Sequence, residues 1–374
     1  MHYLPQSKRG VLIRTQRRLA NAASEARSRK SKRRAARTES SKNISRDLEM
    51  GGRKTRYFPA PKEFNLSSSY ENTVKFLMQF RRYGSGPRPT AFYLDLRGVQ
   101  SISPAGALLL AAELHRWQLR HARKLRSRDA EEWDPTVRKL LATMGFFDLL
   151  AVASGTEIPR GEVEDGRLFL PFICGRNADT TPFIRLRDLI ERTIGRISPR
   201  LLLYQGVSEA ITNVLHHAYQ QNNNLSRWWL SACIDAKLKR LTVMVLDHGI
   251  GIPRTLPRAG TVERLRATLN AVPFLVDDGV MIQAAVTVGR SALQLAHRGN
   301  GLQRDIQHAI RQYKGTARLR IHSNRGLYVF ERFTNGTTNA RTAASIHSLD
   351  GTFVEWTFDL PELELNPQMT LWQL

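Results

Sequence analysis

Three polar residues on a predicted helix have the types and spacing that suit phosphate chemistry. Glu209, Asn213 and His217 recur every four residues within VSEAITNVLHHAY, residues 207–219, so on a helix they line one stripe. An Asn side chain offers a neutral oxygen to a hard cation such as Mg²⁺. A carboxylate one turn earlier suits a general base that accepts a proton from a nucleophile. Glu209 is therefore a candidate catalytic base and Asn213 a candidate metal ligand, although solvated helix faces often have such residues.

An acidic residue followed by two glycines ends a β-rich segment further along the chain. In LTVMVLDHGIGIP, residues 241–253, Asp247 follows an apolar run and precedes Gly249 and Gly251. A carboxylate at a strand end can accept a hydrogen bond from an exocyclic amine such as that of adenine. Glycines let the backbone turn sharply and approach a ligand closely. An ordinary Asp–Gly turn has the same sequence, so the motif also fits a purely structural role.

Two shorter motifs add residues suited to a nucleotide. In HRGNGL, residues 297–302, Gly299 and Gly301 precede a helical pattern, and such a turn presents backbone amides to phosphate. Arg298 would add a charge-assisted contact. Thr352 begins the final predicted strand, where its hydroxyl would hydrogen-bond the base or the carboxylate that binds the base.

The elements that must position these residues alternate between helix and strand. Apolar periodicity predicts helices over 71–82, 104–119, 183–194 and 199–219, around 137–141 and after 301, and strands over 91–96, 168–173, 227–234, 241–246, 317–322, 327–333 and 352–358. Pro104 behind Ser103 suits a capped helix start. This order predicts an α+β fold, a two-layer α/β sandwich with a mixed or antiparallel sheet. Trp228 and Trp229 are expected in its core.

Composition shifts divide the chain into five parts. With 374 residues and 41% hydrophobic content, it is long enough for two domains. The predicted parts are a basic arm (1–56), a smaller α/β domain (57–154), a polar linker (155–166), a larger domain (167–365) and a short tail (366–374).

The arm concentrates positive charge. It holds 17 of the 57 Lys and Arg residues and only four acidic ones, in a chain of formal net charge +24. A segment this polar buries little apolar surface, so we expect disorder. Nucleic acid is the commonest partner of such charge. A solvated extension without a partner fits the composition equally well.

The remaining composition favours a cytoplasmic protein. Cys174 and Cys233 lie far apart and lack metal-ligand spacing, which suits a reducing compartment. No run of about 18 apolar residues predicts a membrane span, and no apolar segment near the start suits a secretory signal.

Together the four motifs resemble, in order and spacing, the GHKL (Bergerat-fold) ATPase superfamily over about 181–360. This group includes histidine kinases, MutL-type mismatch-repair proteins, type II topoisomerase ATPase subunits and anti-sigma-factor serine kinases, and SEAITNVLHHAY looks most like the last. The resemblance implies ATP and Mg²⁺ as ligands, with Asn213 binding Mg²⁺ and Glu209 as general base. It implies that Asp247 accepts a hydrogen bond from the adenine amine. It also implies that Gly249 and Gly251 flank the base and that Gly299 and Gly301 contact the phosphates. The cofactor-binding residues would be Asp247, Gly249, Gly251, Arg298, Gly299, Gly301 and Thr352.

The smaller domain resembles a STAS domain through FYLDLRGVQSISPAGALLLAAEL, residues 92–114. Anti-sigma-factor antagonists have a phosphorylated Ser before the helix-opening glycine. Here Ala105 holds that place, with Ser101 and Ser103 nearby. The resemblance therefore implies a docking or dimerising role, including a possible homodimer, rather than a phospho-switch within the chain.

Three outputs remain open for the expected nucleotide site. ATP hydrolysis would gate binding of an unknown protein partner. Alternatively, the chain would be a serine/threonine kinase that phosphorylates a STAS-type partner. As a third possibility, it would sense ATP without turnover and bind nucleic acid through its arm. A sensor histidine kinase fits least, because no helical hairpin with a phospho-acceptor His precedes the larger domain.

Deleting residues 1–56 tests the arm. If the arm binds nucleic acid, the deletion will sharply weaken binding and flatten its salt dependence, because fewer counterions are released. Fluorescence anisotropy with labelled duplex DNA and RNA from about 50 to 200 mM salt measures both quantities. Equal affinity and equal slope in the two proteins would show that the arm has no part in nucleic-acid binding.

Overall fold

The computed structural model describes residues 47–50, 53–84, 92–127, 129–151, 167–176, 181–194, 200–214, 218, 226–256, 277–287 and 306–360. All of them belong to one compact unit, 47–374. Residues 1–46, the predicted linker and the predicted tail lie outside the described residues. Within the described part, no helix has the length and apolar character needed to cross a membrane.

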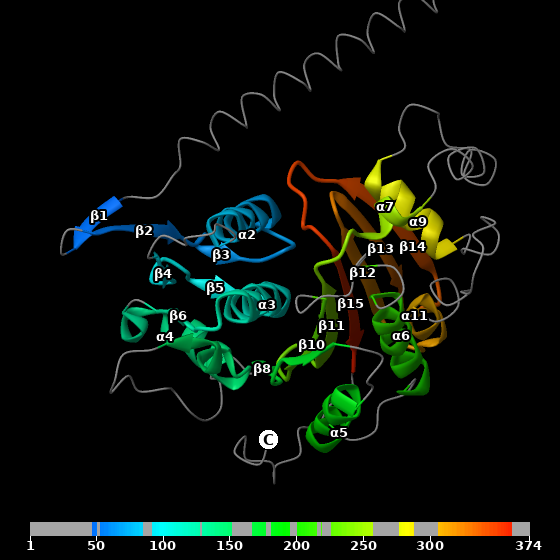
Figure 1. Cartoon of the computed structure of the whole chain (residues 1–374). Coiled ribbons are helices and arrows are strands. Elements are labelled where there is room, and N and C mark those ends of the chain that lie inside the picture. The colour runs from blue at the N-terminus through cyan, green and yellow to red at the C-terminus, as the bar shows by residue number, and fades with distance from the viewer. Residues whose placement is uncertain are drawn as a thin grey trace, which may run out of the picture. The chain divides into compact units, whose positions relative to one another are not determined.

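An eight-stranded sheet forms the centre of the larger region (Figure 1). Its strand order is β14-β13-β12-β15-β11-β10-β8, with β9 also paired to β10. The strands are β8 (Arg167–Phe169), β9 (Ile173–Gly175), β10 (Trp228–Asp235), β11 (Arg240–Asp247), β12 (Ala317–Ser323), β13 (Gly326–Arg332), β14 (Thr338–Ala344) and β15 (Thr352–Asp359).

Every described pairing in this sheet is antiparallel. Short hairpins join β10 to β11, β12 to β13 and β13 to β14, and such connections suit antiparallel pairing, whereas parallel strands need long crossovers. The predicted α+β class is therefore confirmed. The prediction of a mixed sheet was wrong, and the alternative prediction of an antiparallel sheet is confirmed for the described strands.

Helices cover one face of the sheet (Figure 1). Contacts join α5 to β10, α6 to β11, α9 to β13 and β14, and α11 to β12 and β13. The helices of this region are α5 (Thr181–Ile194), α6 (Arg200–Asn213), α7 (Ile252–Thr255), α9 (Asp278–Thr287) and α11 (Gln307–Gln312).

The smaller region, which precedes the sheet in the chain, packs on the opposite face. Its long helix α3 contacts β10 and β11. Its parallel pairs are β2–β4, β3–β5 and β6–β7. Its elements are β1 (Asp47–Met50), β2 (Arg53–Pro59), β3 (Glu63–Phe64), α2 (Tyr70–Gly84), β4 (Phe92–Asp95), β5 (Ser101–Ile102), α3 (Pro104–His121), β6 (Leu125–Arg126), η1 (Ala130–Glu132), α4 (Pro135–Thr143), η2 (Phe146–Leu149) and β7 (Leu150–Ala151).

The first two strands overlap the predicted basic arm. β1 and β2 pair antiparallel, with Asp47–Met50 opposite residues 53–56, so these eight residues of the predicted arm belong to a sheet. The register opposes Met50 to Arg53, which leaves Gly51 and Gly52 between them. Glycine pairs favour two-residue hairpin connections, so the sequence itself favours a hairpin at this point.

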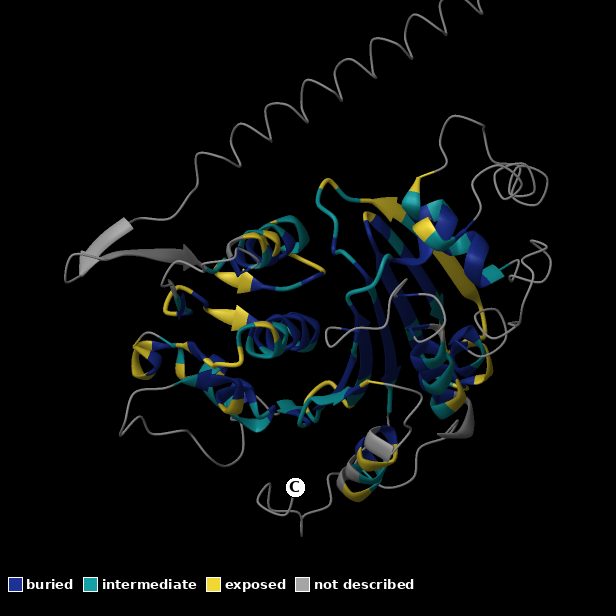
Figure 2. Cartoon of the chain, in the orientation of Figure 1, coloured by how far each residue is buried: buried dark blue, intermediate teal, exposed yellow. Residues whose placement is uncertain are grey.

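Because side chains alternate along a strand, successive residues of the sheet enter two cores, and most of the central strands are coloured as buried in Figure 2. Trp228, Leu230 and Val243 pack in the core beneath the helices. Trp229 and Phe353 pack in the core that also contains the apolar residues of α3. Both tryptophans have no exposed surface, which confirms their predicted core positions. Because both faces are covered, the sheet has little freedom to shift between the two regions.

The start of α3 gives a test of the predicted cap. Ser103 Oγ accepts the Gly106 N–H at 3.0 Å and Pro104 takes the first helical position. We expect Ser103→Ala to lower the free energy of unfolding by about 1 kcal/mol, because an N-terminal amide loses its partner. Urea denaturation measures this change. Ser101→Ala, at an exposed position on β5, is the matched control. Equal free energies of unfolding for the two variants would show that the Ser103 cap does not stabilise the protein.

Candidate functional site

A buried carboxyl group lies where two central strands of the sheet meet. Asp247 ends β11 and is paired with Thr352, the first residue of β15. Its exposed fraction is 4%. Gly249 donates its backbone N–H to Asp247 Oδ1 at 2.6 Å. Thr352 donates both its backbone N–H and its hydroxyl to the same carboxyl group.

Burial dominates the electrostatics of this carboxyl group. Desolvation raises the pKa of Asp247 to about 7, and the hydrogen bonds from Gly249 and Thr352 offset only part of that rise. The group is therefore close to half ionised at neutral pH. A carboxylate accepts roughly four hydrogen bonds, and the described residues supply these three donors, which leaves one acceptor position for an N–H or O–H from outside the described residues.

Two polar residues at the end of β12 hold the turns around this carboxyl group. Ser323 Oγ accepts the Ile252 N–H at 2.8 Å and lies 3.0 Å from both Thr352 Oγ1 and the Gly351 carbonyl oxygen. Asn324 Nδ2 donates to the Ile250 carbonyl oxygen at 3.0 Å. Sequence reasoning missed both residues, because no local motif marks them and only the β12–β15 pairing brings them here.

The glycine turn after β11 lies directly against the chain that follows α6. Ile250 donates its backbone N–H to the Ala218 carbonyl oxygen at 2.8 Å. A Cβ atom at Gly249 would overlap the backbone and side chain of Ala218, so the close approach requires glycine there. Gly251 has a φ of +84°, in the region that glycine favours. The turn and the segment after α6 therefore form one corner of the structure.

Helix α6 packs on the sheet through one face and carries the predicted polar stripe on another. Val207, Ala210 and Ile211 are buried in the core beneath the helices. Glu209 is half-buried. Asn213 is the last residue of α6, and its side chain lies outside the described residues. The i, i+4 spacing of Glu209 and Asn213 on one helix is confirmed, whereas their contacts with a ligand stay a prediction.

The structure thus gathers four predicted residues, Asp247, Gly249, Gly251 and Thr352, at one corner. Glu209 and Asn213 lie on α6, and Ala218, in the chain that follows this helix, contacts the same corner. Three further predicted residues, Arg298, Gly299 and Gly301, lie outside the described residues. Across the described ranges, no three His, Cys, Asp or Glu side chains gather as a metal site would, and Asn213 as a metal ligand stays a prediction.

The chain was compared with known proteins. It matches no protein-family model, and the comparison with curated proteins found no significant match.

The buried carboxyl group predicts a specific pH dependence of stability. Its pKa is about 7 when folded against an ordinary 3.8, so between these values the folded state binds more protons than the unfolded state. Stability attributable to Asp247 is then fully present below pH 4 and falls as pH rises towards 7, with a slope of up to about 1.4 kcal/mol per pH unit.

Asp247→Asn removes this titration while keeping an oxygen acceptor. We expect the variant to gain stability relative to wild type as pH rises from 4 to 7 and the difference to become constant above about pH 8. Urea unfolding at several pH values measures it. Parallel stability curves for the two proteins would show that Asp247 titrates as an ordinary exposed carboxyl group.

Proposed function

We propose that the chain binds ATP with Mg²⁺ in a pocket of the GHKL (Bergerat) type and hydrolyses it to gate binding of a partner. The observation that carries the proposal is the Asp247 carboxyl group. It is buried at a strand end, receives hydrogen bonds from Gly249 and Thr352, and keeps one acceptor position. The exocyclic amine of adenine is a donor that suits this position.

The arrangement of the carboxyl group supports a base-binding role over a purely structural one. A structural aspartate at a turn gains by staying in water, because desolvation of its charge is costly. Asp247 is buried although its pKa rises to about 7 as a result. A donor from a bound base would favour the ionised form and offset part of that cost.

Helix α6 carries the residues that would act at the phosphates of the bound ATP. Glu209 and Asn213 lie one turn apart on it, and the chain after it contacts the glycine turn at Ala218 and Ile250. Asn213 would supply a neutral oxygen to Mg²⁺, which neutralises phosphate charge when bound. Glu209 would accept a proton from a water that attacks the γ-phosphorus as the bond to the ADP oxygen breaks.

The resemblance of the smaller region to a STAS domain is part of the same proposal. Ala105 lies in the first turn of α3 and is buried, so the position of the family's phosphorylated serine holds no hydroxyl. The Ser103 hydroxyl is engaged with Gly106 and lies 3.3 Å from the Phe64 carbonyl oxygen. These contacts favour a docking role for the region.

Two substitutions on α6 test the proposed catalytic residues. We expect Glu209→Ala to bind ATP but to lower turnover about 10²- to 10⁴-fold, because a general base contributes that much. Asn213→Ala should lose Mg²⁺-dependent ATP binding. Isothermal titration measures binding, and γ-labelled ATP measures turnover. Gln205→Ala, at an exposed position one turn before Glu209, is the matched control and should behave as wild type.

The fate of the label separates the possible outputs. Free phosphate supports hydrolysis, whereas label on protein supports a kinase. Binding without either product supports an ATP sensor. Absence of Mg²⁺-dependent ATP binding in the wild-type protein would overturn the proposal.

A further inference from the structure

A buried acid on the smaller region lies directly behind the candidate site. Glu113 projects from α3, and its side chain is only 3% exposed. Arg81, from α2, donates to Glu113 Oε1 through Nε at 3.0 Å and also through Nη2. Burial is the largest single effect and raises the pKa of Glu113, but Arg81, His248 and Arg116 together outweigh it and the pKa falls to about 2. Glu113 is therefore a fixed negative charge.

This ion pair contacts the residue next to Asp247. His248 is 1% exposed, with Nε2 3.3 Å from Glu113 Oε1 and Nδ1 3.3 Å from Arg81 Nη2. The Trp229 ring packs edge-on against the His248 ring at 5.2 Å between centroids. Because His248 directly follows Asp247, its position limits where the Asp247 carboxyl group points.

The same arginine holds the turn that supplies the other donors to Asp247. Arg81 Nη1 pairs with Asp350 Oδ2 at 2.9 Å, and the Asp350 carbonyl oxygen lies 3.3 Å from His248 Nδ1. Two residues later, Thr352 donates to Asp247. Gly351 between them has a φ of +116°, and a Cβ atom there would overlap the Asp247 carbonyl oxygen, so this turn packs tightly on the end of β11.

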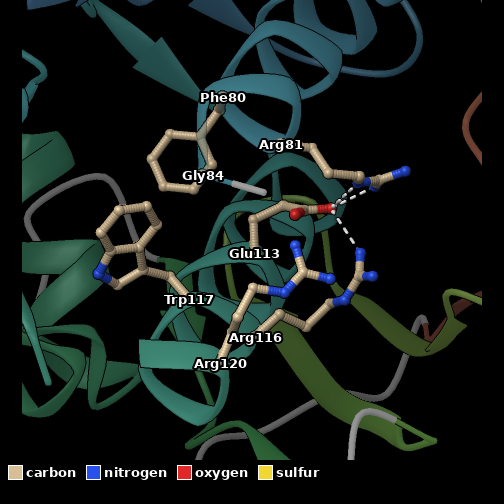
Figure 3. A pocket seen from close by; sticks show the side chains of 7 residues that line it. All are labelled: Phe80, Arg81, Gly84, Glu113, Arg116, Trp117 and Arg120. Atoms are coloured by element: carbon tan, nitrogen blue, oxygen red, sulfur yellow. Dashed lines mark hydrogen bonds and ion pairs between the residues drawn. The ribbon is translucent and has the colours of Figure 1, made fainter. Parts of the chain in front are cut away.

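The ion pair also borders a small pocket between α2 and α3. Figure 3 shows a pocket between α2 and α3, with Arg81, Glu113, Arg116 and Arg120 around it. Its volume is about 20 Å³, which suits roughly one water molecule. Here Arg116 Nη1 lies 3.7 Å from Glu113 Oε1, whereas the contacts of the ion pair with the larger region are those with His248 and Asp350.

We propose that Arg81 and Glu113 are positioning residues for the nucleotide site. From α2 and α3 they hold His248, which directly follows Asp247, and Asp350, which lies two residues before the donor Thr352, so the smaller region sets how well the carboxyl group distinguishes adenine from a base without the amine. This inference rests on the proposed function, because it concerns the same site.

The test compares ATP with inosine triphosphate, which has a carbonyl oxygen in place of the exocyclic amine. Isothermal titration of the full chain with each Mg²⁺–nucleotide gives two dissociation constants. A hydrogen bond from the amine to a carboxylate predicts an ATP preference of about ten- to hundredfold in wild type. Arg81→Met should reduce that preference about tenfold or more, and Arg81→Lys should restore part of it.

A matched control separates positioning from general docking. Glu71, also on α2, accepts the Ile346 and His347 backbone N–H groups at 2.8 and 3.1 Å. Glu71→Gln therefore weakens another contact between the same helix and the same loop without touching His248 or Asp350. It should keep the ATP preference of wild type. Asp350→Asn, at a half-exposed position, is a second variant that should fold and lose part of the preference.

Each outcome bears on one proposal. If wild type prefers ATP and both Arg81→Met and Asp350→Asn prefer it equally strongly, the positioning role is overturned while the nucleotide site stands. A loss in Glu71→Gln as large as that in Arg81→Met would also overturn it, in favour of simple docking. If wild type binds neither nucleotide, the proposed function fails, and the positioning role fails with it.

Discussion

A carboxyl group out of water at the end of a strand constrains everything around it. Asp247 is tolerated in its buried position because Gly249 and Thr352 supply donors, and these come from a turn and from a neighbouring strand. Both must be in register, and β11 and β15 are in register over their whole length. Since the two strands lie inside the sheet with both faces covered, the geometry of the corner is fixed by the core rather than by flexible side chains.

Much of the fold follows from local patterns in the sequence. Ser103 and Pro104 marked the start of α3, and apolar runs marked β10, β11, β12 and β15 close to their observed bounds. β14 was missed, because TNARTAA has neither apolar alternation nor β-branched enrichment and forms a strand only through pairing with β13. Pro171 separates β8 from β9 where one strand was predicted, since proline lacks the N–H that a ladder needs.

The candidate site was predictable where one motif carries its own partners. Asp247 and its donor Gly249 lie in one motif that is visible in the sequence, whereas Thr352 is recognisable as the start of a strand but meets Asp247 only through strand register. Ser323 and His248 were not found, because their partners are long-range: Ile252 and Thr352 for one, Glu113 and Arg81 for the other. A serine at a strand end and a histidine in a turn have no pattern of their own. Only strand register and the packing of α2 and α3 give them their positions.

The core shared by the two regions has a consequence for how the chain acquires its structure. Phe64 and Leu109 pack in the same core as Trp229 and Phe353, and a hydrogen bond from Tyr70 to His347 spans 277 residues. During synthesis α2 and α3 leave the ribosome long before β15 exists. The part of their apolar surface that packs on the sheet then has no partner until the sheet strands are made. Contacts distant in sequence slow folding, so this shared core is expected to close late.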